Sequence, residues 1–335
     1  MNDELIRIAK KIIFNEEIRE LIQNPGLIPQ PNQDGLYLYK GLVDFQIEQC
    51  KTRGSSIEKE GFQIGEPWNG DIENALILFL SSNPAFKFDE VSPRLDITSG
   101  DIFEPEHIDV TTKNTITDRK ISCFKEIEDF FKSRIIKSHA NNSNDELLRI
   151  PLKNGKTHDV RYWKKIRVRT EYLLPDELKI FWENKVQTKA KYVRKIMEYV
   201  VCMEIVPFKS TGEEGLTKVG NTNFTKNLFD HCWKSFTSKI LELSGASIFI
   251  LVGSKALKTF IRNLNLHPSI ESNLRTGKPF ELILGKRNRT IVYTPYNQGT
   301  MPLLPDCLPS ETIKQLRDTL ARRIIFDNKI ASGDF

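Results

Sequence analysis

Four short apolar runs constrain the fold of this chain more than any other feature. They cover residues 75–80, 199–206, 246–252 and 290–294, and a polar or proline-containing turn follows each run. Runs that are apolar at almost every position, rather than at alternate positions, are typical of strands buried on both faces of a parallel sheet. We therefore expect a central four-stranded parallel sheet with these segments as its strands.

Segments with apolar residues at helical spacing lie between and after these runs. The helices predicted in this way cover residues 119–137, 159–174, 186–198, 223–243, 254–263 and 309–328. Strands that alternate with helices are typical of the α/β class, in which helices cover both faces of the sheet. The sequence therefore predicts a three-layer α/β/α domain.

Two further segments flank or interrupt this domain. Residues 1–70 predict an N-terminal helical and loop extension, with one helix over residues 3–23 and then a stretch rich in Gly and Pro. The α/β domain is expected to cover residues 71–330. Because the segment between the first two strands is far longer than a crossover needs, residues 85–195 are expected to form a helical, basic insertion.

Positive charge is concentrated in that insertion. The whole chain has 49 Lys and Arg against 44 Asp and Glu, a formal net charge of +5. Within residues 161–169, Lys164, Lys165 and Arg167 stand beside two aromatic residues. Cations interleaved with aromatic side chains suit the phosphates and splayed bases of a nucleic acid. A solvated helix face would show the same pattern, and the sequence leaves both interpretations open.

The cysteine and histidine patterns argue against several kinds of site. The chain has five cysteines, and no two of them have CxxC spacing. This argues against a disulfide framework, a zinc ribbon and a four-cysteine iron–sulfur site. The five histidines are scattered, and no glycine-rich phosphate loop, HExxH or GxSxG signature is present. We therefore expect neither a metal nor an organic cofactor.

The apolar content of the chain also bears on its location. The longest apolar run, residues 75–80, is far shorter than a membrane span requires. The first residues are charged and lack the apolar core of a signal peptide. We expect a cytoplasmic protein in a reducing compartment, with no membrane partner.

The loops that follow the four strands carry the residues of greatest chemical interest. In an open parallel sheet, ligands bind beyond the carboxyl ends of the strands, so these loops are expected to line one crevice. They read SSNPAF, PFKSTG, GSKAL and PYNQGTMPLLP, at residues 81–86, 207–212, 253–257 and 295–305. In this order they resemble the four motifs of the uracil-DNA glycosylase superfamily, outside its iron–sulfur branch.

The resemblance implies both a fold and a reaction. It covers about residues 72–304 without the insertion, and it implies hydrolysis of the N-glycosidic bond of a base flipped out of DNA. DNA, double- or single-stranded, would be the partner. Asn83 would orient the attacking water. Asn297 stands where the family usually has a histidine that donates to the leaving base, so this departure puts ordinary excision rates in doubt.

The resemblance also suggests contacts with the base and with the strand. Gln298 lies beside Asn297 in the fourth motif, and Phe86 and Phe103 are candidates to stack on the extruded base. Leu303 is the candidate wedge into the base stack, although Met301, Leu303 and Leu304 would serve equally to anchor the loop. Further contacts with DNA would come from Ser82, Lys209, Ser210, Thr211, Ser254 and Lys255, and from the basic residues Lys164, Lys165 and Arg167.

Glu204 is the most informative single residue, because it interrupts an apolar strand at the end that faces the crevice. An ionised carboxylate only accepts hydrogen bonds. It would repel O4 of uracil and would fit the N4 amino group of a cytosine. The position therefore favours a base with an exocyclic amine. A buried salt bridge, or a protonated carboxyl able to donate, would also explain a carboxyl group at this point.

The sequence thus predicts a monofunctional DNA glycosylase that acts on a non-canonical base. A modified cytosine in phage DNA is the leading candidate, because an enzyme that removed ordinary cytosine would destroy its host genome, and some prokaryotic relatives act in phage defence. Uracil or another deaminated base is the second option. A nucleic-acid-binding protein that has lost catalysis on the same fold remains a third, and an enzyme acting on a small nucleotide a fourth.

Overall fold

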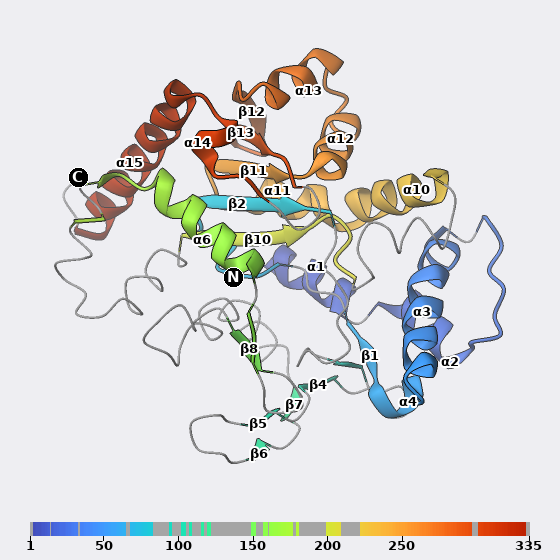
Figure 1. Cartoon of the computed structure of the whole chain (residues 1–335). Helices are drawn as coiled ribbons and strands as arrows, with labels where there is room; N and C mark the ends of the chain where they lie inside the picture. Colours follow the sequence, from blue (N-terminus) through green and yellow to red (C-terminus); the bar gives the residue numbers. More distant parts are fainter. Residues whose placement is uncertain are drawn as a thin grey trace.

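The protein is described here from a computed structural model. It describes residues 3–13, 15–32, 34–64, 68–82, 94–95, 102–104, 107–108, 115–116, 119–121, 149–151, 157–159, 161–176, 179–180, 199–208, 222–296 and 301–332. Figure 1 shows the arrangement of the helices and strands.

A five-stranded sheet forms the centre of the protein (Figure 1). Its strand order is β10 (Val200–Glu204), β2 (Ile77–Ser81), β11 (Ile248–Val252), β13 (Arg287–Thr294) and β12 (Phe280–Leu284). The first four are parallel to their neighbours, which confirms the four apolar runs as parallel strands. The expected count of four strands was wrong, because β12 adds an antiparallel edge strand.

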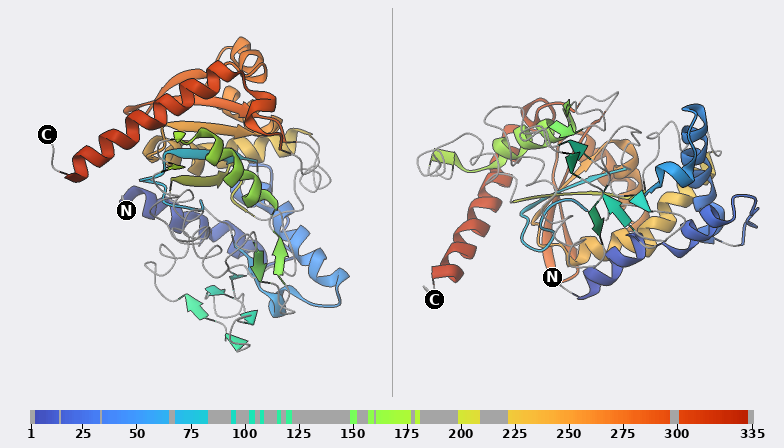
Figure 2. Two further views of the ribbon diagram at one scale, coloured as in Figure 1. Left: turned by 60° about the vertical axis from the view of Figure 1, so that its left-hand side comes forward. Right: turned by 90° about the horizontal axis from the view of Figure 1, so that it is seen from below.

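Helices cover both faces of this sheet, as an α/β layer architecture requires. Residues alternate along β2, so that Leu78 and Leu80 join a core with α1 (Asp3–Ile13) and the helices between residues 222 and 275. Ile77 and Phe79 join a second core with α6 (Arg161–Leu173) and α15 (Ser310–Ser332). In the left-hand view of Figure 2, α6 and α15 lie in front of the sheet.

The N-terminal region is more helical than its composition suggests. The single helix predicted over residues 3–23 is two, α1 and α2 (Glu16–Gln23), because the Asn15 side chain accepts the Ile18 N–H at 2.9 Å and caps a new helix. The Gly- and Pro-rich stretch that follows contains α3 (Asp34–Thr52), α4 (Ile57–Glu60) and β1 (Phe62–Gln63). Residues of α1, α2 and α3 belong to the larger core, and the boundary at residue 70 stays a prediction.

The insertion contains strands where helix was expected. Residues 119–121 form β7 rather than the start of a helix. With only three residues, β7 is too short to show a recognisable alternation of polar and apolar residues. The helix predicted over residues 186–198 lies outside the described residues, whereas the one over 159–174 is confirmed as α6. The other short strands are β3 (Arg94–Leu95), β4 (Ile102–Glu104), β5 (His107–Ile108), β6 (Thr115–Ile116), β8 (Arg149–Pro151) and β9 (Thr157–Asp159).

The C-terminal helices follow the prediction closely. The segment 223–243 is helical throughout, as α10 (Thr222–Cys232), a π-helical turn (Trp233–Thr237) and α11 (Ser238–Leu243). Helix α12 (Ser254–Asn263) has the predicted bounds, and α15 the predicted position. Two short helices were not predicted, α13 (Pro268–Arg275) and α14 (Leu304–Cys307). No helix in the part of the chain described here is long and apolar enough to cross a membrane.

Candidate functional site

The carboxyl ends of the four parallel strands meet at one edge of the sheet. Glu204, the last residue of β10, lies opposite Ser81, the last residue of β2. Val252 at the end of β11 lies opposite Thr294 at the end of β13. The loops that follow these strands therefore start side by side, which is the arrangement expected of a ligand site in an open α/β sheet.

Glu204 and Ser81 form a hydrogen-bonded pair at this edge. The Ser81 hydroxyl donates to Oε2 of Glu204, with 2.5 Å between the oxygens. The Glu204 side chain is half-buried, and by strand alternation it lies on the face of the sheet that α6 covers. Burial raises the pKa of the Cys202 thiol, two residues earlier, and the charge of Glu204 raises it further. The predicted acceptor is therefore placed at the strand end with one donor already in contact.

Tyr296 is a residue of this site that the sequence analysis missed. It follows β13, and its side chain is 37% exposed. Burial raises the pKa of its phenol, and the nearby charge of Glu204 adds to the rise. A Cβ atom built on Gly253, after β11, would lie 3.6 Å from the Cβ of Tyr296, and Gly253 has a φ of +84°. Tyr296 thus stands among groups from three different strand ends. Its place two residues after an apolar strand was the sequence signal that could have identified it.

Helix α6 brings a cation to the same place. Nζ of Lys165 lies 5.5 Å from the centre of the Tyr296 ring, within range of a cation–π contact. Arg167, two residues on, instead donates to Glu171 on its own helix at 3.1 Å. The predicted basic cluster is therefore divided, since Lys165 lies at the strand edge while Arg167 supports the helix. The Lys164 side chain lies outside the described residues.

Arg169 joins α6 to the loop after β13, and no sequence signal identified it. Its side chain is buried, and its guanidinium donates to the backbone oxygens of Met301 and Pro302. It also donates to the backbone oxygen of Lys165 at 2.6 Å. Burial lowers the pKa of Arg169. One buried cation thus ties the returning end of the fourth loop to the helix that carries Lys165.

The structure separates the three apolar residues of the fourth loop. Met301 and Leu304 are buried and belong to the core beneath α15. Leu303 is 38% exposed, and its N–H donates to Oδ2 of Asp306 at 3.2 Å. Of these three, Leu303 alone is exposed enough to enter a base stack, and the other two anchor the loop.

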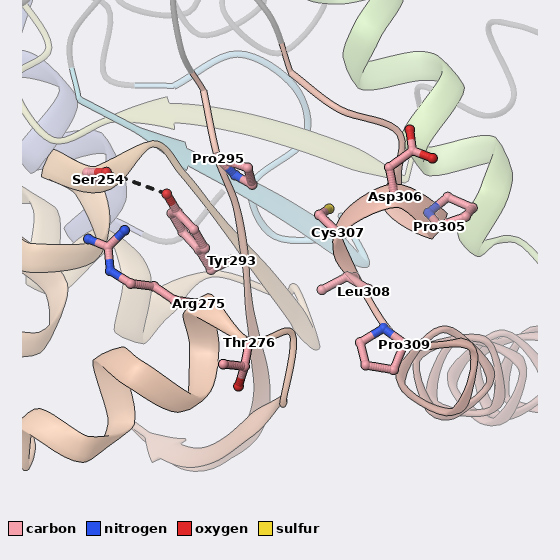
Figure 3. Close-up of a pocket in the computed structure, with 10 residues that line it drawn as sticks. All are labelled: Ser254, Arg275, Thr276, Tyr293, Pro295, Pro305, Asp306, Cys307, Leu308 and Pro309. Carbon is pink, nitrogen blue, oxygen red and sulfur yellow. Dashed lines mark hydrogen bonds between the residues drawn. The ribbon is translucent and has the colours of Figure 1, made fainter.

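Ser254 and Lys255 are the first two residues of α12, and their contact with DNA stays a prediction. Ser254 is exposed, and its Oγ lies 3.5 Å from the hydroxyl of Tyr293. It lines a cavity of about 610 Å³ between the end of β13, the end of α13 and residues 305–309 (Figure 3). Neither Glu204 nor Tyr296 lines this cavity. Ser254, a predicted contact with DNA, therefore lines a cavity that does not include Glu204, the predicted contact with the base.

Among the other predicted site residues, Ser82 alone has a described side chain, which is buried directly after β2. Phe103 lies on β4, which pairs with β3 and β7 in a separate small sheet, and only its backbone is described. Their assignment as site residues stays a prediction. The remaining positions lie outside the described residues: Asn83, Phe86, Lys209, Ser210, Thr211, Asn297 and Gln298.

The described cysteines and carboxylates form no metal centre. Within the described residues, no group of three or more His, Cys, Asp or Glu side chains is placed to hold a metal ion. Cys50, Cys202 and Cys232 are buried free thiols, and Cys307 is a partly buried one. Burial raises the pKa of the Cys307 thiol. It therefore stays protonated near neutral pH, and a thiolate nucleophile is not indicated at this position.

Comparisons with known proteins gave no match. No family model, no curated protein and no solved structure matches this chain.

Proposed function

We propose that this protein is a monofunctional DNA glycosylase that removes a non-canonical base, a modified cytosine in the leading version. The observation that supports the proposal best is the meeting of Glu204, Tyr296 and Lys165 at the carboxyl edge of the sheet. A hydrogen-bond acceptor, an aromatic ring and a cation there come from a strand, a loop and a helix far apart in the sequence. They correspond to three parts of an extruded nucleotide: an amine, a flat ring and a phosphate.

Glu204 would select the base. A carboxylate accepts from the N4 amino group of cytosine and is repelled by O4 of uracil. The Ser81 hydroxyl, which donates to Oε2 at 2.5 Å, would hold the carboxylate in one orientation. Fixing such a group before the ligand arrives lowers the entropy cost of binding. The preference for an exocyclic amine would then be a property of the free protein.

Tyr296 and Lys165 would hold the rest of the nucleotide. The Tyr296 ring is partly exposed and offers a face for the base or sugar. The Lys165 ammonium lies over that ring and would attract the neighbouring phosphate. This arrangement would place a cation beside a base whose leaving form is an anion, and such a cation stabilises the charge that develops as the bond breaks.

Hydrolysis of the glycosidic bond would follow the motif residues. The C1′–N bond breaks, its electron pair stays on the base, and C1′ becomes an oxocarbenium-like cation. The oxygen of a water molecule bonds to C1′, and one proton of that water ends on the departing base. Asn83 would orient the water and Asn297 would donate to the base, as the resemblance implies. The reaction as proposed needs no metal and no organic cofactor.

The base chemistry suggests a biological setting. A glycosylase that removed ordinary cytosine would damage its own genome, so the amine-bearing substrate is proposed to be a modified cytosine in phage DNA, and the role to be defence. Removal of uracil or another deaminated base in repair is the alternative within the same reaction.

A protein that binds DNA without cutting the glycosidic bond is the second candidate. It is favoured by one feature, the absence of a histidine from residues 295–305. A neutral amide donates to an anion more weakly than a charged donor does. The basic helix and the strand edge would serve binding equally well.

One assay distinguishes these functions. The purified full chain is incubated with single- and double-stranded oligonucleotides that carry uracil, 5-hydroxymethylcytosine or glucosylated 5-hydroxymethylcytosine, and alkali then cleaves any abasic site. We expect cleavage at a modified cytosine and little cleavage at unmodified cytosine. Cleavage with uracil alone would indicate repair, and binding without cleavage of any substrate would indicate the binding protein.

A further inference from the structure

A cavity of about 610 Å³ opens at the same edge of the sheet, beside the end of β13 (Figure 3). Pro295 lines it, and the next residue, Tyr296, lies instead near Lys165 and Glu204. Consecutive residues after β13 therefore belong to two different groups of side chains. A cavity of this volume is of the size that nucleotide-sized ligands occupy.

Two hydroxyls lie on one wall of the cavity. Tyr293 is 6% exposed, and its hydroxyl oxygen lies 3.5 Å from Ser254 Oγ. Hydrogen bonds between hydroxyl oxygens normally span about 2.5–3.0 Å, so this one is long. Figure 3 shows the Tyr293 hydroxyl at the cavity, directed towards Ser254. A hydroxyl donates one hydrogen bond and accepts up to two, so both groups can also bond a ligand in the cavity.

The same wall carries a cation. The guanidinium carbon of Arg275 lies 5.4 Å from the centre of the Tyr293 ring. Its Nε and Nη2 donate to Oε1 of Glu271 at 3.0 and 2.8 Å. These bonds orient the guanidinium, which has more N–H donors than the two bonds use. Arg275 is one of the residues that line the cavity (Figure 3). Two hydroxyls and a guanidinium on one wall are a donor set suited to phosphate oxygens.

Residues 305–309 form the opposite wall (Figure 3). Pro305, Leu308 and Pro309 are its apolar members, and Asp306 and Cys307 are its polar ones. Oδ2 of Asp306 accepts the N–H of Leu303 at 3.2 Å. A Cβ atom on Gly277 would lie 2.5 Å from Cδ of Pro309, so the two walls approach as closely as a glycine allows, at a φ of +80°. Thr312 donates to the backbone oxygen of Gly277 at 3.0 Å. This close packing joins the segments that carry Thr276 and Pro309, two residues that line the cavity.

We propose that this cavity binds a phosphate ester of nucleotide size. Ser254, Tyr293 and Arg275 hold the phosphate, and the sugar and base lie against the prolines and Leu308. The ligand is either a free nucleotide or a nucleotide of a nucleic-acid strand, because both present the same phosphate ester. The inference stands on the cavity alone and does not require that the protein be a glycosylase.

Binding measurements on the full chain test the site. Deoxynucleoside monophosphates and a short single-stranded oligonucleotide are titrated separately by calorimetry. We expect binding of at least one probe, about tenfold weaker binding in Arg275→Gln, and several-fold weaker binding in Tyr293→Phe. The control is Lys286→Gln, which removes the same charge from an exposed turn outside the cavity. Binding of the monophosphates would identify a free nucleotide as the source, and binding of the oligonucleotide alone would identify a strand.

Cys307 reports whether the probe enters this cavity. Its thiol lines the cavity and is partly buried, so a bound ligand should slow its alkylation, which mass spectrometry of the peptides measures. Slower alkylation with the wild type and not with Arg275→Gln supports the site. Three results would overturn the proposed site: no binding of either probe, binding by both variants as tight as that of the wild type, or an alkylation rate that the probe leaves unchanged. None of these readouts depends on excision, so they are separate from any failure of the proposed function.

Discussion

Two groups of polar side chains at the carboxyl edge of the sheet differ in composition. On the side of β10 and β2, the Glu204 carboxylate lies beside the Ser81 hydroxyl, with Tyr296 and Lys165 close by, and we call this group the Glu204 cluster. On the side of β13, an arginine and two hydroxyls line a cavity whose other wall carries the carboxylate of Asp306 among apolar residues. Our proposals assign an amine on a flat ring to the Glu204 cluster and a phosphate to the cavity. The difference in donors and acceptors is what separates the two assignments.

The largest expected effect tests whether the Glu204 cluster and the cavity act independently. Glu204→Gln should lower excision of a modified cytosine by about 100-fold, because it removes a charge-assisted hydrogen bond that contributes up to about 3 kcal/mol. Phosphate binding in the cavity should not change. The matched control is Glu242→Gln, which changes a half-buried carboxylate of α11 that pairs with Lys239. An equal loss of excision and of phosphate binding in Glu204→Gln would show that the cluster and the cavity form one site.

Arg169 is expected to support both the Glu204 cluster and the cavity, because it holds the loop that contains Met301 and Pro302. Arg169→Met leaves the backbone oxygens of Met301 and Pro302 without their donor, which should lower the free energy of unfolding by about 2 kcal/mol. Urea denaturation measures this. Arg169→Lys should recover part of the stability and of the excision rate. A methionine variant as stable as the wild type would remove Arg169 from this account.

Lys165, in the Glu204 cluster, should make a smaller and purely electrostatic contribution to DNA binding. Lys165→Met is expected to weaken binding of any DNA by a few-fold and to lower the slope of log affinity against log salt by about 1. Lys314→Met, an exposed residue of α15, should leave the slope unchanged. The same slope in both variants would place Lys165 outside the path of the strand.

The smallest effect concerns pH. The pKa of Tyr296 is raised in the folded protein by burial and by Glu204, so above the usual tyrosine pKa of about 10 the unfolded chain releases this proton first and stability falls as pH rises. Tyr296→Phe should therefore lose less stability between about pH 9 and 11 than the wild type, which urea denaturation at several pH values measures. Identical pH profiles would show that folding does not raise the pKa of Tyr296.

The sequence predicted the centre of the fold because its signal there is strong. Continuous apolar runs identified the four parallel strands, and a carboxylate inside one of them identified Glu204. Strand β12 was missed because its residues alternate between exposed and half-buried, within a segment rich in charge. Helix α3 was missed because Gly35 and its polar neighbours masked an apolar face that packs into the main core.

The candidate site was only partly predictable for a different reason. Contacts between residues distant in sequence leave no local pattern. The Lys165–Tyr296 contact joins the insertion to the last loop, and the bonds of Arg169 to Met301 and Pro302 do the same. The close contact of Gly277 with Pro309 likewise joins two segments that line the cavity beside Tyr293. Such meetings follow from tertiary packing, which neither periodicity nor composition encodes.

The most direct test of the central claim is the identity of the released base. Duplexes that carry 5-hydroxymethylcytosine and uracil are mixed in equal amounts, and mass spectrometry measures each free base released by the wild type and by Glu204→Gln. We expect the wild type to release 5-hydroxymethylcytosine, the base with the amine, in excess over uracil, and we expect Glu204→Gln to shift this ratio towards uracil. The same ratio for both proteins would contradict the assignment of Glu204 as the group that reads the base.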